Sequence, residues 1–142
     1  MSDKSDRTVV LLNEKDIVAD WRVTRKLGEG GCGVVFEETS NSVRPRGRFA
    51  MKVESRCIDR DEQLLRAEAA VLKRMRNSKH GPHLITAGRT ASFNFLLMDL
   101  LGRSLNELVK ATPKRMFSVE TVLKIAVQTL AVSHIVSSTP DF

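Results

Sequence analysis

Residues 23–52, VTRKLGEGGCGVVFEETSNSVRPRGRFAMK, hold the pattern that decides the fold. Gly28, Gly30 and Gly33 match G-x-G-x-x-G, a spacing that two unrelated nucleotide-binding folds use. A dinucleotide-binding fold needs a helix directly after the last glycine. Residues 34–36 are instead Val-Val-Phe, which favours a β-strand. A P-loop is disfavoured because no Gly-Lys-Ser/Thr triplet follows the glycines.

A second strand is predicted after a polar turn. Residues 39–42 are Thr-Ser-Asn-Ser, and Pro45 and Gly47 extend the turn. Phe-Ala-Met-Lys-Val at 49–53 then has the composition of a strand that ends near Lys52. This order of elements puts the glycines at the tip of a hairpin. Because glycine has no β-carbon, the backbone there can approach a phosphate group closely.

Four segments, taken together, resemble the nucleotide-binding lobe of protein kinases between about Trp21 and about Leu130. They are LGEGGCGVVF, FAMKVES, LRAEAAVLKRM and FNFLLMDLLGRSLNEL. As a set they are similar to the casein kinase one superfamily, nearest its tau-tubulin kinase branch. The resemblance implies an α+β fold with a protein-kinase-like small lobe, followed by a partial helical large lobe. The small lobe would be a five-stranded antiparallel sheet plus one helix.

The resemblance and the turn signals divide the chain into three parts. The expected parts are a flexible tail (1–20), the nucleotide-binding small lobe (21–101) and an incomplete large lobe (102–142). Further strands are predicted over residues 84–90 and 93–100, where apolar runs alternate with turn residues. Helices are predicted over residues 104–111 and from Ser118 onward, with serine as a possible cap of the first.

The helix of the small lobe is predicted over residues 61–76, with Asp59-x-x-Glu62 as its capping box. Its spacing puts five apolar side chains on one face: Leu64, Leu65, Val71, Leu72 and Met75. Glu68 shares that face, where a carboxylate is costly unless it is paired or reaches water at the edge of the stripe. The residues alone leave both alternatives open. The kinase resemblance supplies a partner, Lys52, which pairs with the helix glutamate and holds the α- and β-phosphates of ATP.

The resemblance also implies an adenine pocket. Met98 would guard its back, while the Asp99 carbonyl and the Leu101 amide would hydrogen-bond the adenine edge. The alternative for each apolar member, taken singly, is ordinary core packing. The full set of expected ATP-binding residues is Leu27, Gly28, Gly30, Gly33, Val35, Ala50, Lys52, Glu68, Met98, Asp99 and Leu101.

The chain has 142 residues, a net charge of +6 and a pI near 9.7. Basic and acidic residues are interleaved, which favours a solvated mixed-charge surface, so we expect neither nucleic acid nor a membrane as partner. The family resemblance implies protein substrates of acidic character. Cys32 and Cys57 suggest no disulfide framework, and an intracellular location, cytoplasmic or nuclear, is expected. His80 and His83 share a Gly-Pro loop without further ligands, so no metal site is expected.

The kinase pattern ends after Leu130. The family would continue with a His-Arg-Asp motif, an Asn and an Asp-Phe-Gly motif, whereas this chain ends in SSTPDF. The catalytic aspartate and the magnesium ligands expected for the family are therefore absent, and we expect weak ATP binding without phosphotransfer from this chain alone. The main interpretation is a truncated serine/threonine kinase domain. A non-catalytic, pseudokinase-like module that binds nucleotide or a partner is the alternative, and a dinucleotide-dependent oxidoreductase is disfavoured.

The helix after Ser118 has an apolar face that the rest of a large lobe would cover. This face is marked by Val119, Val122, Leu123, Ala126 and Leu130. Left uncovered, an apolar patch promotes association. We therefore expect poor solubility and chaperone binding.

Overall fold

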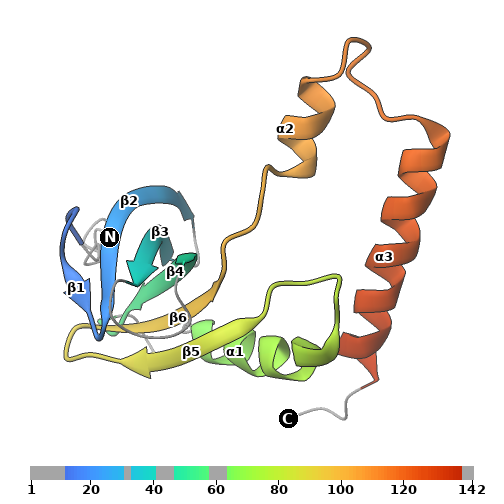
Figure 1. The fold of residues 1–142 in the computed structure, drawn as a ribbon. Helices are drawn as coiled ribbons and strands as arrows, with labels where there is room; N and C mark the ends of the chain where they lie inside the picture. The colour runs from blue at the N-terminus through green and yellow to red at the C-terminus, as the bar shows by residue number, and fades with distance from the viewer. Residues whose placement is uncertain (1–11, 31–32, 41–46, 58–63, 139–142) are drawn as a thin grey trace, which may run out of the picture.

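The computed structural model describes residues 12–30, 33–40, 47–57 and 64–138, and it has the predicted α+β architecture (Figure 1). Its strands are β1 (Ile17–Val18), β2 (Trp21–Gly30), β3 (Gly33–Ser40), β4 (Gly47–Ser55), β5 (Leu84–Arg89) and β6 (Phe93–Asp99). Its helices are α1 (Leu65–Arg74), the 3₁₀ turn η2 (Met75–Asn77), α2 (Leu105–Lys110) and α3 (Val119–Ser137). The five predicted strands are β2 to β6. The short strand β1, which lies within the predicted tail, adds a sixth.

The strands form one antiparallel sheet in the order β1-β2-β3-β4-β6-β5. One face of the curled sheet encloses an apolar core, because alternate residues of each strand point to the same side. Trp21 and Phe49 meet there edge to face, with ring centroids 5.0 Å apart. The buried members of this core are Val18, Trp21, Val23, Val34, Phe36, Phe49, Met51, Val53, Phe93, Phe95 and Leu97.

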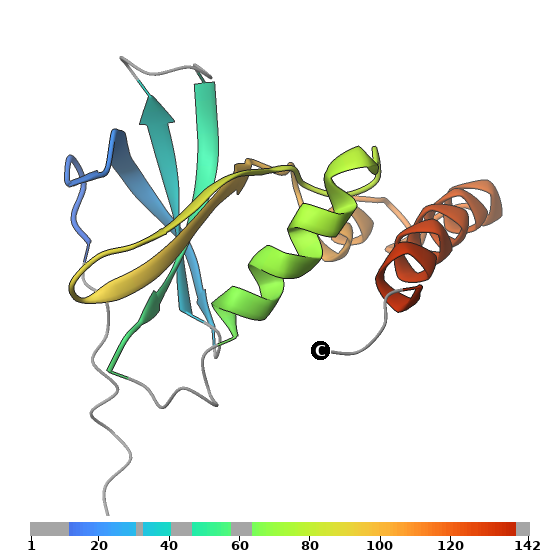
Figure 2. The same ribbon diagram turned by 90° about the horizontal axis from the view of Figure 1, so that it is seen from below.

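The opposite face of the sheet packs against α1, which runs beside the strands in Figure 2. A smaller apolar cluster joins the two elements through Leu65 and Leu72 of α1 and Leu96 of β6. The predicted stripe is therefore correct for most of its members. Leu64 is the exception: it directly precedes the first helical residue and is about half exposed.

A glutamate from β4 caps the first amides of α1. The Glu54 Oε1 atom accepts hydrogen bonds from the amides of Leu64, at 2.7 Å, and Leu65, at 3.1 Å. These amides have no partner within the helix, and the buried carboxylate satisfies them. The helix begins at Leu65, later than predicted. The predicted capping box, Asp59 and Glu62, lies outside the described residues.

The C-terminal segment leaves the sheet after β6 and forms α2 and α3. Ser104 caps α2 in a reciprocal box with Glu107, and Ser118 caps α3, which agrees with the predicted starts. The hydrogen bond from the Ser104 amide lowers the pKa of the Glu107 carboxyl. The C-terminal end of α3 returns to contact α1 and η2.

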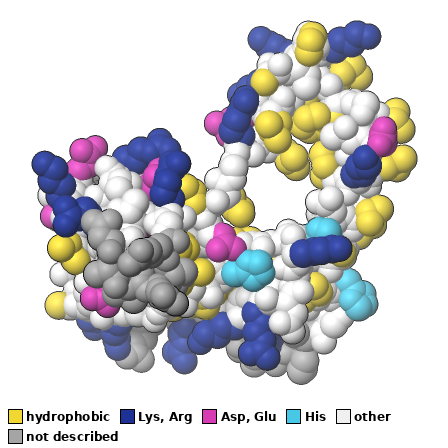
Figure 3. All heavy atoms as spheres, in the orientation of Figure 1, with side chains coloured by type: hydrophobic (Ala, Val, Ile, Leu, Met, Phe, Trp, Pro, Cys, Tyr) yellow, Lys and Arg dark blue, Asp and Glu magenta, His cyan; other side chains and the backbone are white. Residues whose placement is uncertain are grey.

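The apolar side chains of α2 and α3 remain largely uncovered. Figure 3 shows them gathered over these two helices, whereas side chains of both charges are visible around the sheet. The exposed members on this segment include Leu105, Leu108, Met116, Val119, Val122, Leu123, Val127 and Leu130. The predicted apolar face is thus present. Neither α2 nor α3 has a fully buried residue.

Candidate functional site

The site is built around an ion pair between the sheet and α1. Lys52 of β4 and Glu68 of α1 approach to 2.5 Å between Nζ and Oε2, which confirms the predicted pair. Their side chains are only 17% and 34% exposed, so the pair is partly shielded from water. The ion pair with Lys52 therefore offsets the desolvation of the Glu68 carboxylate beside the apolar stripe. Glu68 does not turn fully into solvent.

The strand register brings further predicted residues to the same face as this ion pair. Val35 lies opposite Lys52, and Ala50 lies opposite Met98. Residues that oppose each other across antiparallel strands point to the same side, and Ala50 and Lys52 are two apart on β4. Met98 also packs against the cluster that joins β6 to α1. Strand pairing alone thus gathers four of the predicted residues beside α1.

The three motif glycines have different local surroundings. Gly33 has a φ of +113°, and a β-carbon added to it would lie 2.1 Å from the Val53 carbonyl oxygen. The fold itself therefore requires glycine at this position. At Gly28 and Gly30 an added β-carbon would meet nothing within 4 Å. Gly30 pairs with Gly33 across the hairpin, and a strand rather than a helix follows, as predicted.

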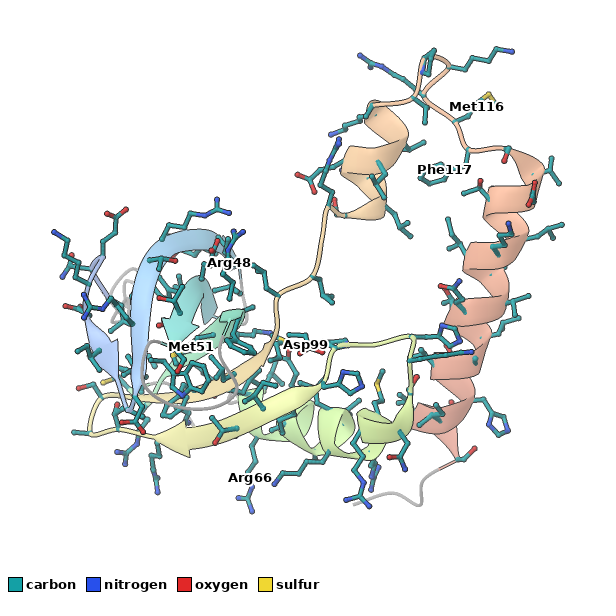
Figure 4. All side chains as sticks on the ribbon, in the orientation of Figure 1. Arg48, Met51, Arg66, Asp99, Met116 and Phe117 are labelled. Carbon is teal, nitrogen blue, oxygen red and sulfur yellow. The ribbon has the colours of Figure 1, made fainter. Side chains whose placement is uncertain are left out.

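The end of β6 and the linker after it contain the last three predicted residues. Met98 is half-buried, Asp99 ends the strand, and Leu101 is 62% exposed on the segment that leads to α2. Figure 4 marks Asp99 at this exit from the sheet. Leu27, a predicted cover of the site, lies on β2 and is exposed.

Two arginines on the same face were not identified from sequence. The buried Glu37 carboxylate accepts a hydrogen bond from Arg48 Nε at 2.5 Å and another from Arg25 Nε at 2.8 Å. The Arg48 hydrogen bond, with the contribution of Arg25, lowers the pKa of Glu37 despite its burial. This triad joins β2, β3 and β4 at one end of the face that carries Ala50, and Figure 4 labels Arg48 there. Arginines and glutamates are scattered along the sequence, so no periodic signal predicts the triad.

His83 is another residue to which the sequence analysis assigned no role in the site. Its ring Nδ1 lies 2.7 Å from Asp99 Oδ2, and its amide donates to the same oxygen at 3.0 Å. Its carbonyl accepts the Asp99 amide at 3.1 Å. The residue therefore contacts the predicted adenine-binding segment, although its spacing from His80 had suggested only a weak case for a metal pair.

Comparison with known proteins shows which proteins have sequences similar to this chain. The chain is 35% identical over 108 residues to a probable serine/threonine-protein kinase of Dictyostelium discoideum, which covers 76% of this chain and 21% of that protein. It is 33% identical over 129 residues to casein kinase I homolog 1 of Saccharomyces cerevisiae, covering 89% and 21%. It is 35% identical over 111 residues to casein kinase I homolog 1 of Schizosaccharomyces pombe, covering 78% and 24%.

The chain is homologous to casein kinase I-type serine/threonine protein kinases. It spans about a quarter or less of the length of these curated relatives. No protein-family model matches the chain. This homology agrees with the sheet, the helix and the Lys52–Glu68 pair. Placement nearest the tau-tubulin kinase branch stays a prediction.

Proposed function

We propose that this chain is the ATP-binding lobe of a casein kinase I-type kinase domain, joined to the first helices of a large lobe. The observation that carries the proposal is the Lys52–Glu68 pair on the face of the sheet that holds Val35, Ala50 and Met98. A lysine held by a helix glutamate is the element with which protein kinases position the α- and β-phosphates. The homology to kinases supports the same conclusion.

The surroundings of the pair fit a nucleotide. The open space at Gly28 and Gly30 leaves room for a phosphate chain to approach the backbone of the hairpin. Lys52 would supply one positive charge, and the Asp99 carbonyl and Leu101 amide would meet the adenine edge. Ala50 is small and lies between Glu37 and Met98 in the register, which leaves space for a ring beside it.

The described residues give no separate support for a magnesium site. No group of three or more His, Cys, Asp or Glu side chains that could hold a metal ion is found among the residues that the structure describes. The 142-residue sequence also lacks a His-Arg-Asp motif. We therefore propose that this chain alone binds ATP weakly and does not transfer its phosphate, since positioning without a base and metal is insufficient. Protein substrates of acidic character belong to the proposal for the complete kinase.

We assign α3 to the apolar interior of a large lobe. Within the described part of the chain, α3 alone is long and apolar enough to cross a membrane. A core helix of a soluble protein meets the same criteria. Glu120 and Lys124, which pair on its surface at 2.6 Å, favour a protein environment over lipid at that end of the helix.

The test is a titration of the 142-residue chain with ATP, followed by nuclear magnetic resonance, beside a radiolabelled-ATP transfer assay with casein. We expect Lys52→Ala to weaken ATP binding about tenfold or more, because a charged hydrogen bond to phosphate is lost. Lys124→Ala is the matched control, since it removes an exposed lysine–glutamate pair on α3. Equal ATP affinity in the wild type and Lys52→Ala would refute nucleotide binding at this site. Lys52-dependent transfer to casein would refute the non-catalytic part.

A further inference from the structure

The contact between His83 and Asp99 lies where the chain leaves the sheet. Three hydrogen bonds join the two residues: two from His83, through its ring and its amide, to Asp99 Oδ2, and one from the Asp99 amide to the His83 carbonyl. One carboxylate oxygen thus receives two donors from a single residue. Such a pair fixes both the carboxylate and the adjoining peptide in one orientation.

On the β4 side Asp99 is still paired with Phe49, so the bonds to His83 restrain Asp99 on the β5 side of the strand. The last paired residues of β5 and β6 are Leu84 and Met98, and an irregularity in the register follows between Leu84 and Thr86. Asp99 is one residue beyond that pair, and the chain then continues without regular structure to α2. The bonds to His83 extend the ladder by one residue at the point where the linker begins.

We propose that His83 is a positioning residue for the adenine-binding segment, an inference that rests on the proposed function. By holding the Asp99 side chain and amide, His83 sets the direction of the Asp99 carbonyl and of the following peptide groups up to Leu101. These are the groups that would meet the adenine edge. A preorganised acceptor and donor bind more tightly than mobile ones, because less ordering remains to be done on binding.

The contribution of this contact to folding stability is expected to be small. The side chains of His83 and Asp99 are 51% and 40% exposed, and exposed pairs contribute little to the free energy of folding. A positioning role and a structural role therefore predict different results. Removal of the ring should change nucleotide affinity and the local dynamics of the linker, while the melting temperature changes little.

The test compares His83→Ala, His83→Asn and His80→Ala in the full 142-residue chain. Alanine keeps the backbone bonds and removes the ring. Asparagine places an amide nitrogen near the position of Nδ1, so it can restore the lost donor. His80 is the matched control, an exposed histidine of the same loop whose amide contacts Ser78.

We expect His83→Ala to weaken ATP binding about five- to tenfold, as for the loss of one hydrogen bond, and His83→Asn to recover most of that loss. The Asp99 amide should exchange with solvent about tenfold faster in His83→Ala, without nucleotide, and near the wild-type rate in His83→Asn. Unchanged affinity in His83→Ala, in a wild type that binds ATP, would overturn the inference. So would a loss that asparagine fails to recover.

The exchange measurement separates failure of this inference from failure of the proposed function. If neither the wild type nor Lys52→Ala binds ATP, the proposed function fails, and nucleotide affinity can no longer report on His83. Asp99 amide exchange then decides the positional claim. Exchange that is the same in wild type and His83→Ala would overturn it.

Discussion

The carboxyl of Glu38 should make the stability of this lobe depend on pH in the neutral range. Glu38 lies on β3 opposite Val23 of β2 and Phe49 of β4, on the face of the sheet that holds the aromatic core. Its exposed fraction is 0%, and neither carboxylate oxygen has a hydrogen-bond partner among the residues that the structure describes. Burial raises the pKa of Glu38 from 4.5 to about 7. The acid is therefore neutral in the folded core at mildly acidic pH.

The sign and size of the effect follow from this difference in pKa. An acid whose pKa is higher in the folded state contributes fully to stability below its unfolded pKa. That contribution is lost as the pH rises from 4.5 through about 7, and the loss then levels off. One pKa unit corresponds to about 1.4 kcal/mol, so the total loss is on the order of 3 kcal/mol. This is a large fraction of the stability of an ordinary domain.

The perturbation is Glu38→Gln, which keeps the shape of the side chain and removes its titration. Urea unfolding at pH 5 and pH 8 can be followed through Trp21, the single tryptophan, which is buried against Phe49. We expect the free energy of unfolding of Glu38→Gln, relative to wild type, to rise by about 2.5 kcal/mol between the two pH values, because part of the loss has already occurred at pH 5. The buried amide has its own cost, so the pH dependence of the difference is the informative quantity.

Glu37→Gln is the matched control, because Glu37 is the neighbouring residue on the opposite face of the same strand. Arg48 and Arg25 lower its pKa, so its contribution to stability is present above pH 4.5 and is lost as the pH falls below that value. Between pH 5 and pH 8 the difference between this variant and the wild type should stay nearly constant. A difference for Glu38→Gln that is equally constant would refute the claim that Glu38 is neutral in the folded core.

Three further predictions concern single positions. Gly33→Ala should reduce the free energy of unfolding by about 3 kcal/mol or more in urea melts, because its φ is positive and Val53 blocks the β-carbon, whereas Gly28→Ala should change it by less than about 1 kcal/mol. Glu54→Ala should cost about 1–3 kcal/mol and speed amide exchange at the start of α1, while Glu54→Gln, which keeps an acceptor, should cost less. Leu130→Glu on the exposed face of α3 should shift the chain toward a monomer in sedimentation experiments. Unchanged association would show that the surface responsible for self-association lies elsewhere.

Sequence reasoning predicted those parts of the fold that local chemistry controls. The strand after Gly33, the cap at Ser104 and the helix start near Ser118 follow from propensity and from hydrogen-bonding groups within a few residues. The Lys52–Glu68 pair could be predicted because Glu68 lies on an apolar stripe and the family resemblance supplied its partner. In each of these cases the signal lies in the segment itself or in a known long-range pattern.

The features that the sequence did not predict depend on contacts between distant strands. Glu54 reaches α1 across a ten-residue separation, and its position in the sequence gives no sign of a capping role. The two glutamates at 37 and 38 are identical in sequence terms, yet the pleat directs one to a pair of arginines and the other into an aromatic core. Strand register decides between these surroundings, and register is set by the whole sheet.

The glycine motif shows how fold and function can be separated within one short segment. If all three glycines served the hairpin alone, each would be expected to have a positive φ or a blocked β-carbon, as Gly33 does. Gly28 and Gly30 have neither, so the backbone geometry would accept alanine at both. Their lack of a side chain instead leaves open space on the strand that lies beside Val35 and Lys52. An effect of Gly28→Ala on ATP affinity, without an effect on stability, would therefore assign this glycine to the ligand and not to the fold.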